Sequence, residues 1–381
     1  MASLPQETAT PTDTAAMTTS NPGATPPTAP EDLVRRGLPS WFYIYVVLAA
    51  LLVIFSVWHG GKFADDTNFR NMAVDAAILL MLAIGATFVI ITAGIDLSVS
   101  AVLVFSAIAG ARVMVNFSGT AEQVRQYEHP DQNIGIPLGL AVSILCGLGW
   151  GLVNGLAITK LKLPPFIVTL GTLGMALGFA QMISGGTSVA YVPIAVQEEI
   201  GARRIGFYQG EFVFGASADG RNYGQVPVLV ILTFAVAIIA LITLSRTRFG
   251  RYTYAIGSNA AAARRAGINV DRHLIKVYGL SGLLAGLAGA MDVARFATAS
   301  SSTHSTDNLN AISAVVIGGT SLFGGMGSIL GTIAGAFIPT VLRNGLIIGG
   351  IDPFWQQVLI GAILIAAVYI DQRRRNAEER M

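Results

Sequence analysis

Long apolar runs separated by short polar connections constrain this chain more than any other feature. Most of them approach the roughly 20 residues that cross the hydrocarbon core of a bilayer. In lipid, the hydrogen bonds of the backbone must be formed within a helix or a closed barrel. The strands of a barrel would alternate between polar and apolar residues, and these runs do not. Only 12% of the 381 residues are charged, about half the usual share in soluble domains. We therefore expect an all-α, polytopic transmembrane helical bundle of about ten helices, over roughly 41–58, 72–92, 97–115, 136–158, 164–184, 226–244, 275–293, 308–322, 326–348 and 354–371.

The sequence divides into three parts. Residues 1–38 are rich in Ala, Thr and Pro and carry almost no large apolar side chains, so they predict a disordered N-terminal tail. Residues 39–371 form the transmembrane domain, which includes a polar connection at 245–276, and residues 372–381 form a basic tail. Lys and Arg are concentrated in that connection and that tail, and the positive-inside rule then places both of them, and both termini, in the cytoplasm.

Glycine patterns indicate close helix packing and an internal repeat. In the fourth and ninth runs, glycine recurs every fourth residue, which places it on one helix face. Each run is followed by a Pro-Phe pair that opens the next, and the two runs have opposite polarity in this topology. The pattern predicts an inverted repeat of segments 2–5 and 7–10, although glycine stripes are also common in membrane bundles without a repeat. The packing glycines are Gly147, Gly151, Gly155, Gly327, Gly331 and Gly335.

A carboxylate interrupts the second and third apolar runs. The segment from Ile91 to Ser100 contains Gly94, Asp96 and Ser98, and an acidic group there is costly unless it faces protein, water or a helix end. Asp96 and Ser98 stand where the third helix begins, so either could cap its free N–H groups. Direct contact with a transported molecule is the alternative interpretation.

The basic connection at 245–276 predicts a short helix of its own. Asn259 is a suitable N-cap, the alanines that follow favour helix, and Gly267 is a suitable stop. The basic charge alone would be only a topology signal, but a capped helix with a defined end indicates docking of a partner. The residues concerned are Ser258, Asn259, Ala262, Arg264, Arg265 and Gly267.

Several other chemistries find no support in the sequence. It contains no Gly-x-x-x-x-Gly-Lys-Ser/Thr phosphate-binding loop, so we expect no nucleotide, catalytic or other cofactor site in this chain. The four histidines are scattered without metal-ligand spacing. The net charge of +2 is too small to argue for nucleic acid, and the single cysteine, Cys146, excludes an intrachain disulfide.

Taken together, four motifs resemble the ribose-type, monosaccharide permease subunits of bacterial ATP-binding cassette (ABC) importers, which are related to branched-chain amino-acid permeases. The motifs are the Asp96 segment, the stretch 163–172, the connection around 250–268 and the glycine-rich stretch 314–328, in that order along about 41–371. The sequence departs from the family in having alanines at 260–262, where acidic residues are frequent, and Ser100, where glycine is usual.

The resemblance implies a non-catalytic permease of ten helices that works as a homodimer in the bacterial inner membrane. It also implies a cytoplasmic ATP-binding subunit, of the fused two-domain type, that binds the ATP and Mg. An external binding protein, periplasmic or lipid-anchored, would deliver a monosaccharide such as ribose, xylose, galactose or fructose. The connection at Asn259 to Gly267 matches the coupling helix of such permeases, and the outer connections 116–135, 185–225 and 294–310 would face the binding protein.

The predicted spans contain few planar polar or aromatic groups of the kind that recognise sugars, so we expect a weakly binding path with specificity in the external protein. The candidate path residues are Asp96, Ser98, Asn154, Phe166, Gln181, Asn308 and Asn310. Two alternatives stay open. The chain could move another small polar solute (a branched-chain amino acid, a nucleoside or a polyol), or it could be a stand-alone ion-coupled transporter, which would need ionisable groups at the midplane.

Overall fold

The computed structural model describes residues 40–208, 211–215 and 224–352, together with scattered positions between 354 and 369. The predicted N-terminal tail at 1–38 and the basic tail at 372–381 lie outside these residues. Most of the tenth predicted segment, 354–371, does so as well.

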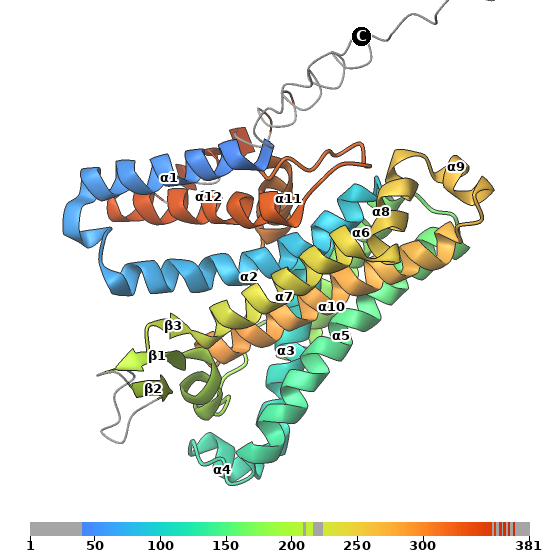
Figure 1. Ribbon diagram of the computed structural model, residues 1–381. Coiled ribbons are helices and arrows are strands. Elements are labelled where there is room, and N and C mark those ends of the chain that lie inside the picture. Colours follow the sequence, from blue (N-terminus) through green and yellow to red (C-terminus); the bar gives the residue numbers. More distant parts are fainter. Residues whose placement is uncertain are drawn as a thin grey trace, which may run out of the picture. The chain divides into compact units, whose positions relative to one another are not determined.

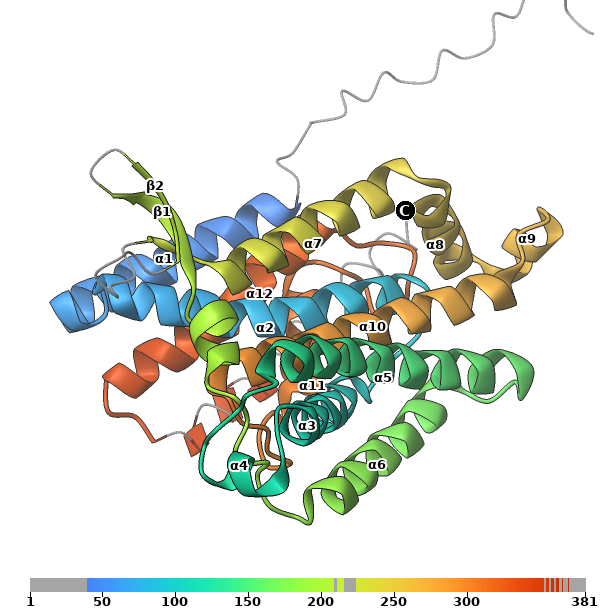
Figure 2. The same cartoon turned by 90° about the horizontal axis from the view of Figure 1, so that it is seen from below.

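Helices dominate the described part of the chain (Figures 1 and 2). Eight of them are long and apolar enough to cross a membrane, and a shorter apolar helix, α11 (Asp307–Ile317), coincides with the eighth predicted segment. The predicted all-α polytopic bundle is therefore confirmed. The eight are α1 (Ser40–His59), α2 (Asp66–Ile91), α3 (Val99–Phe117), α5 (Gln132–Lys160), α6 (Pro165–Ser184), α7 (Val228–Arg246), α10 (Val270–Phe296) and α12 (Ile329–Ile348).

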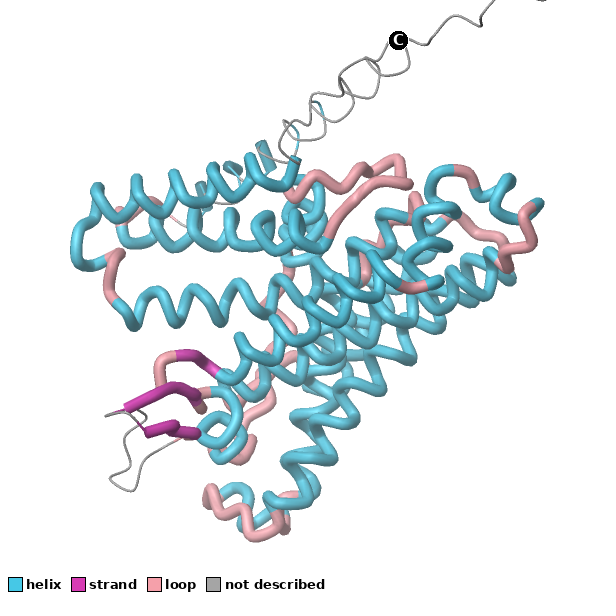
Figure 3. Tube along the Cα trace, viewed as in Figure 1, coloured by secondary structure: helices cyan, strands magenta, loops and turns pink. Residues whose placement is uncertain are grey.

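Short elements occupy the two ends of the long helices, as Figures 1 and 3 show. At one end lie α8 (Arg248–Ser258) and α9 (Ala260–Arg265). At the other end lie α4 (Ala121–Arg125) and a small antiparallel sheet in the order β2-β1-β3. The sequence did not predict the sheet; its strands are β1 (Arg204–Tyr208), β2 (Glu211–Phe214) and β3 (Val226–Pro227). A 3₁₀ turn, η1 (Gly60–Lys62), and a π turn, η2 (Gln197–Gly201), complete the described elements.

Burial separates the helices at the centre of the bundle from those at its edge. In α2, 94% of the apolar window is buried, whereas in α1 the share is 6%. A helix that is apolar all round belongs in a protein interior or in lipid, and these two helices are the two cases. Helix α2 contacts α7, α10, α11 and α12, so it forms the core against which the rest is arranged.

Glycines allow α5 and α10 to pack closely against each other. A methyl group on Gly147 would lie 2.3 Å from the carbonyl oxygen of Gly282, and one on Gly282 would lie 2.3 Å from the carbonyl oxygen of Gly147. Gly151 faces the backbone of Tyr278 at 2.3 Å in the same way, and Gly155 faces Ile275. Any larger side chain at these positions would push the two helices apart.

The second glycine set behaves differently. Gly331 and Gly335 lie on α12 and face the backbone of α11, at Gly318 and Ala314 respectively. Gly327 precedes the helix, whose N-cap is Ser328, and packs against Thr320. The prediction that Gly327 shares a helix face with the other two is therefore wrong, because the Ser328 cap starts the helix after it.

Helix contacts pair up as an inverted repeat requires. Helices α3 and α5 pack together as α11 and α12 do, α5 packs on α10 as α12 packs on α2, and α3 packs on α10 as α11 packs on α2. Exchanging α2 with α10, α3 with α11 and α5 with α12 maps these contacts onto one another. The partner that α6 would have in this scheme is the tenth segment, which lies outside the described residues.

Candidate functional site

The connection between α2 and α3 is an irregular stretch of backbone within the bundle. Non-helical backbone at membrane depth is tolerated only where protein or a polar cavity satisfies it. Two side chains from other helices do so here. The hydroxyl of Thr169 on α6 donates to the carbonyl oxygen of Ile95 at 3.3 Å, and the amide of Asn308 on α11 donates to the carbonyl oxygen of Leu97 at 3.2 Å. Gly94 is needed because a methyl group there would lie 2.6 Å from the hydroxyl of Tyr278.

Asp96 lies at the centre of this connection and is buried. Its Oδ1 accepts hydrogen bonds from the backbone N–H of Ser98 at 3.0 Å and from the Ser98 hydroxyl at 2.6 Å. Its Oδ2 accepts a third, at 3.0 Å, from the hydroxyl of Ser281 on α10. These donors replace the water that a carboxylate loses on burial.

The same network continues into two further helices. The amide of Asn154 on α5 donates to the Ser98 hydroxyl at 2.9 Å, and the hydroxyl of Thr172 on α6 donates to the Asn154 carboxamide oxygen at 2.6 Å. We call Asp96, Ser98, Asn154, Thr172 and Ser281 the inner polar cluster. It ties the α2–α3 connection to α5, α6 and α10.

The prediction that Asp96 or Ser98 caps the start of α3 with its side chain is wrong. Ser98 is the N-cap residue of α3, but neither its side chain nor that of Asp96 bonds the free N–H groups of the first turn. Those two side chains are turned toward each other and toward neighbouring helices instead. Asp96 thus stabilises the connection rather than the helix start.

The remaining candidate path residues do not join the cluster. Phe166 and Gln181 are exposed on α6, near its two ends. Asn310 lies on α11, where its amide donates to Asp307 at 3.0 Å. Ser281 and Thr172 are members that the sequence did not single out, because isolated hydroxyls in apolar runs carry no spacing signal.

The 245–276 connection folds as two short helices, α8 and α9, before α10 begins. The predicted cap of the second is confirmed, because Asn259 Oδ1 accepts a hydrogen bond from the N–H of Ala262 at 2.9 Å. The predicted stop is confirmed too, because Gly267 has a φ of 83° and closes the last turn through its N–H to Arg264. The preceding helix, α8, was not predicted.

Helix α9 is anchored by one side and exposed on the other. Ala263 is buried against Ile256 and Val270, whereas Ala262 and Arg265 are exposed. Arg264 is also exposed and forms an ion pair with Asp271 at 2.7 Å. The result is a short capped helix that presents small and basic side chains outward.

A glycine junction joins these helices to the membrane-spanning part. We use this name for Ile91, Gly257 and Gly325. The N–H of Gly325 donates to the carbonyl oxygen of Ile91 at 2.9 Å, and a methyl group on Gly257 would lie 1.7 Å from that same oxygen. Beside it, the hydroxyl of Tyr254 donates to the carbonyl oxygen of Gly327 at 2.7 Å. The end of α8 therefore touches both the end of α2 and the turn before α12.

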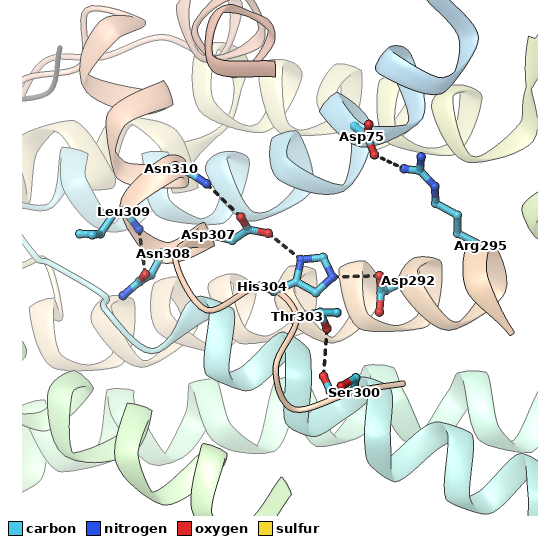
Figure 4. Close-up of polar contacts among 10 residues, drawn as sticks. All are labelled: Asp75, Asp292, Arg295, Ser300, Thr303, His304, Asp307, Asn308, Leu309 and Asn310. Carbon is cyan, nitrogen blue, oxygen red and sulfur yellow. Dashed lines mark hydrogen bonds and ion pairs between the residues drawn. The ribbon is translucent and has the colours of Figure 1, made fainter. Parts of the chain in front are cut away.

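A charged cluster lies at the opposite end of the bundle (Figure 4). The His304 ring bonds Asp292 on α10 through Nε2 at 2.8 Å and Asp307 on α11 through Nδ1 at 2.6 Å. Burial lowers the pKa of His304, but the hydrogen bonds and charges of the two carboxylates outweigh it and raise the pKa to about 10. The ring is therefore an imidazolium that links two helices across the 297–306 connection. We call these three residues the outer charged cluster.

Comparisons with known proteins agree with one another. Residues 68–368 match the family described as branched-chain amino acid transport system / permease component. A fructose import permease protein of Rhizobium meliloti is 38% identical over 331 residues, 86% of this chain and 84% of that protein. A ribose import permease protein of Escherichia coli K12 is 32% identical, over 88% of this chain and 96% of that protein. A galactose/methyl galactoside import permease protein of the same strain is 33% identical, over 86% and 93%. No solved structure matches.

Proposed function

We propose that this chain, which belongs to the branched-chain amino acid transport system permease family, is the membrane-spanning subunit of an ABC importer for a monosaccharide. The family match and the sugar permeases similar to this chain confirm the resemblance that the sequence indicated. As a permease subunit, the chain is a transport component rather than an enzyme. The fructose, ribose and galactose permeases that resemble it over most of their length favour a sugar as cargo.

The observation that carries the proposal is α9 with its junction. Helix α9 is capped and lies outside the membrane-spanning helices. Its Ala263 is buried, whereas Ala262 and Arg265 are exposed, which is the form of a docking element. The preceding helix, α8, contacts Ile91 and Gly325 through Gly257, which connects α9 to the end of α2 and to the turn before α12. A transporter that worked alone would have no use for such an element.

The basic residues around α8 and α9 favour the cytoplasmic side of a bacterial inner membrane for these two helices. Both termini then lie in the cytoplasm, and the sheet, α4 and the 297–306 connection lie outside. A cytoplasmic ATP-binding subunit would bind the ATP and Mg. It would contact Ser258, Asn259, Ala262, Arg264, Arg265 and Gly267. The outer connections at 116–135, 185–225 and 294–310 would receive an external sugar-binding protein.

A second copy of the chain would complete the importer. Helix α6 presents exposed apolar side chains along its length, including Phe166, Leu170 and Phe179, and it has few neighbours among the described helices. This face suits a partner helix as well as it suits lipid. Between two copies, Phe166 and Gln181 would border the path, whereas Asp96, Ser98 and Asn154 would hold the α2–α3 connection in place without touching sugar.

In this proposal, ATP-driven movement of the partner displaces α9, and the glycine junction passes the displacement to the ends of α2 and α12. The inner polar cluster keeps the α2–α3 connection rigid, so α2 and α3 move as one body. This chain supplies no bond-breaking chemistry; it binds, couples and moves.

The decisive experiment is reconstitution in liposomes with the ATP-binding subunit and binding protein encoded by neighbouring genes. We expect ATP-dependent uptake of D-fructose, D-ribose or D-galactose that requires all three proteins. Uptake of leucine alone would favour the branched-chain amino acid alternative, and uptake driven by an ion gradient without ATP would overturn the proposal.

The docking role of α9 has its own test. Replacing Arg264 and Arg265 by glutamate reverses the exposed charge of α9 without removing its cap, and we expect the ATP-binding subunit to copurify at least about tenfold less. Arg125→Glu at the opposite end is the matched control and should leave assembly unchanged. Undiminished copurification of the double variant would refute the docking role.

A further inference from the structure

A cavity of about 480 Å³ lies at the end of the bundle opposite α8 and α9. It opens between α2, α10, α11 and α12 and is closed on one side by the 297–306 connection. The volume is within the range of small-molecule sites. The transport scheme above assigns the 294–310 connection, which lines part of the cavity, to the binding protein, but gives the cavity itself no role. Its polar lining includes Asp75, Arg295, His304, Asp307, Asn310 and Arg343.

The charges around the cavity balance. Arg295 is paired with Asp75 at 2.5 Å, and the His304 imidazolium is held between Asp292 and Asp307 (Figure 4). Arg343 on α12 is the remaining cation that lines it. Three positive groups thus face three carboxylates, so a ligand with a net charge would gain little from the site as a whole.

Polar atoms remain available beside these pairs. The Asn310 side chain donates through its amide to Asp307, which leaves its carboxamide oxygen as an acceptor. Arg343 is exposed and, within the described part of the chain, donates no hydrogen bond. The half-exposed ring of Phe296 also lines the cavity, 4.9 Å from the guanidinium of Arg295. Planar donors and acceptors next to an aromatic ring suit adjacent hydroxyl groups, which donate and accept at once.

We propose that this cavity is an entry site that holds the transported monosaccharide after its release from the binding protein. The inference rests on the proposed function, which supplies both the outer location and the sugar. It adds a place within a single copy of the chain where the cargo is bound before it enters the path. Binding is weak, in the millimolar range, because the strongest polar groups of the lining are already paired with each other.

Cysteine protection tests the site directly. Cys146 is the only cysteine, so a Cys146→Ala background allows single cysteines to be introduced at the exposed lining positions Ser302 and Ser305. A membrane-impermeant maleimide then reports access to the cavity. At a sugar concentration ten times Kd, alkylation at either position should slow about tenfold. Ala64→Cys, exposed in the connection between α1 and α2 and outside the cavity, should react at an unchanged rate.

The probes are D-fructose, D-ribose and D-galactose, with inorganic phosphate as the anionic competitor. Protection at Ser302→Cys and Ser305→Cys by the sugar that the complete importer transports, and none by phosphate, is the expected result. Protection by phosphate instead would identify an anion site and overturn the proposal. No protection by a sugar that is demonstrably transported would overturn it as well.

Transport kinetics separate this inference from the proposed function. In the complete importer, Asn310→Leu should raise the KM for uptake about five- to tenfold, the loss of one or two hydrogen bonds to the cargo, with kcat largely kept. Lys62→Leu is the control, because Lys62 is exposed in the connection between α1 and α2, outside the cavity and outside the three connections assigned to the binding protein. An unchanged KM for Asn310→Leu would overturn only the inference that the cavity binds the sugar. An importer that transports none of the three sugars would overturn the proposed function.

Discussion

Two clusters hold carboxylates inside this bundle, and they do so in opposite ways. The inner polar cluster satisfies Asp96 with neutral donors, from Ser98 and Ser281. The outer charged cluster satisfies Asp292 and Asp307 with one imidazolium, beside a cavity of about 480 Å³. The first arrangement holds the backbone of the α2–α3 connection in place. The second leaves charged groups at the edge of a space that a ligand can fill.

Removing the carboxylate of the inner cluster should have the largest effect. Asp96→Ala takes the acceptor from three donors in a buried site, which we expect to cost about 3 kcal/mol of stability. Thermal unfolding in detergent, followed by loss of the folded peak in size-exclusion chromatography, measures it. Asp66→Ala is the control, because Asp66 is an exposed carboxylate paired with Arg70 and should cost below about 1 kcal/mol. Equal effects of the two substitutions would show that the three buried donors do not make Asp96 more important to stability than an exposed carboxylate.

A smaller effect on stability, but a clear one on coupling, should come from the glycine junction. Gly257→Ala places a methyl group against the carbonyl oxygen of Ile91, and such overpacking costs about 1–3 kcal/mol. Since the junction connects α9 to α2, we expect ATP hydrolysis to continue while uptake per ATP falls. Gly149→Ala on α5, where a methyl group meets nothing within 4 Å, should leave both unchanged. Normal uptake per ATP in the Gly257 variant would show that coupling takes another route.

The outer charged cluster should reveal itself by pH. Because the pKa of His304 is raised to about 10 in the folded protein from an ordinary 6.5, its contribution to stability is full below pH 6.5. It is lost as pH rises through 10. The groups that face the ring are Asp292 on α10 and Asp307 on α11, with Arg343 on α12 nearby.

We therefore expect the melting temperature to fall more steeply between pH 7 and 10 in the unchanged protein than in a His304→Asn variant. Parallel melting curves across that range would contradict the linkage. His129→Asn, a substitution at an exposed histidine elsewhere at the same end, is the control and should retain the slope.

Much of the fold could be predicted from the sequence because lipid leaves few choices. Long apolar runs gave the helices, and local signals gave the cap at Asn259 and the stop at Gly267. The inner polar cluster could be predicted only in part. Asp96 is conspicuous in an apolar run, but Ser281 lies 185 residues away and looks like any helical serine.

The outer charged cluster was missed for a related reason. His304, Asp292 and Asp307 have no recognisable spacing, since the irregular 297–306 connection brings them together. The sheet was missed because its strands are short and lie within a long connection. In each case the determining contact is between distant helices or within a loop, where periodicity carries no information.

The pairing of helix contacts has a consequence for the direction of transport. Exchanging α2 with α10 and α3 with α11 also exchanges their connections, so the α2–α3 connection with Asp96 and the α10–α11 connection with His304 are counterparts toward opposite ends of the bundle. A chain formed from a duplicated and inverted unit begins with two equivalent faces and cannot distinguish uptake from release. Directionality must then arise where the two copies diverged. Here one copy of the connection became a support that is held by neutral donors, and the other became a charged border around a cavity.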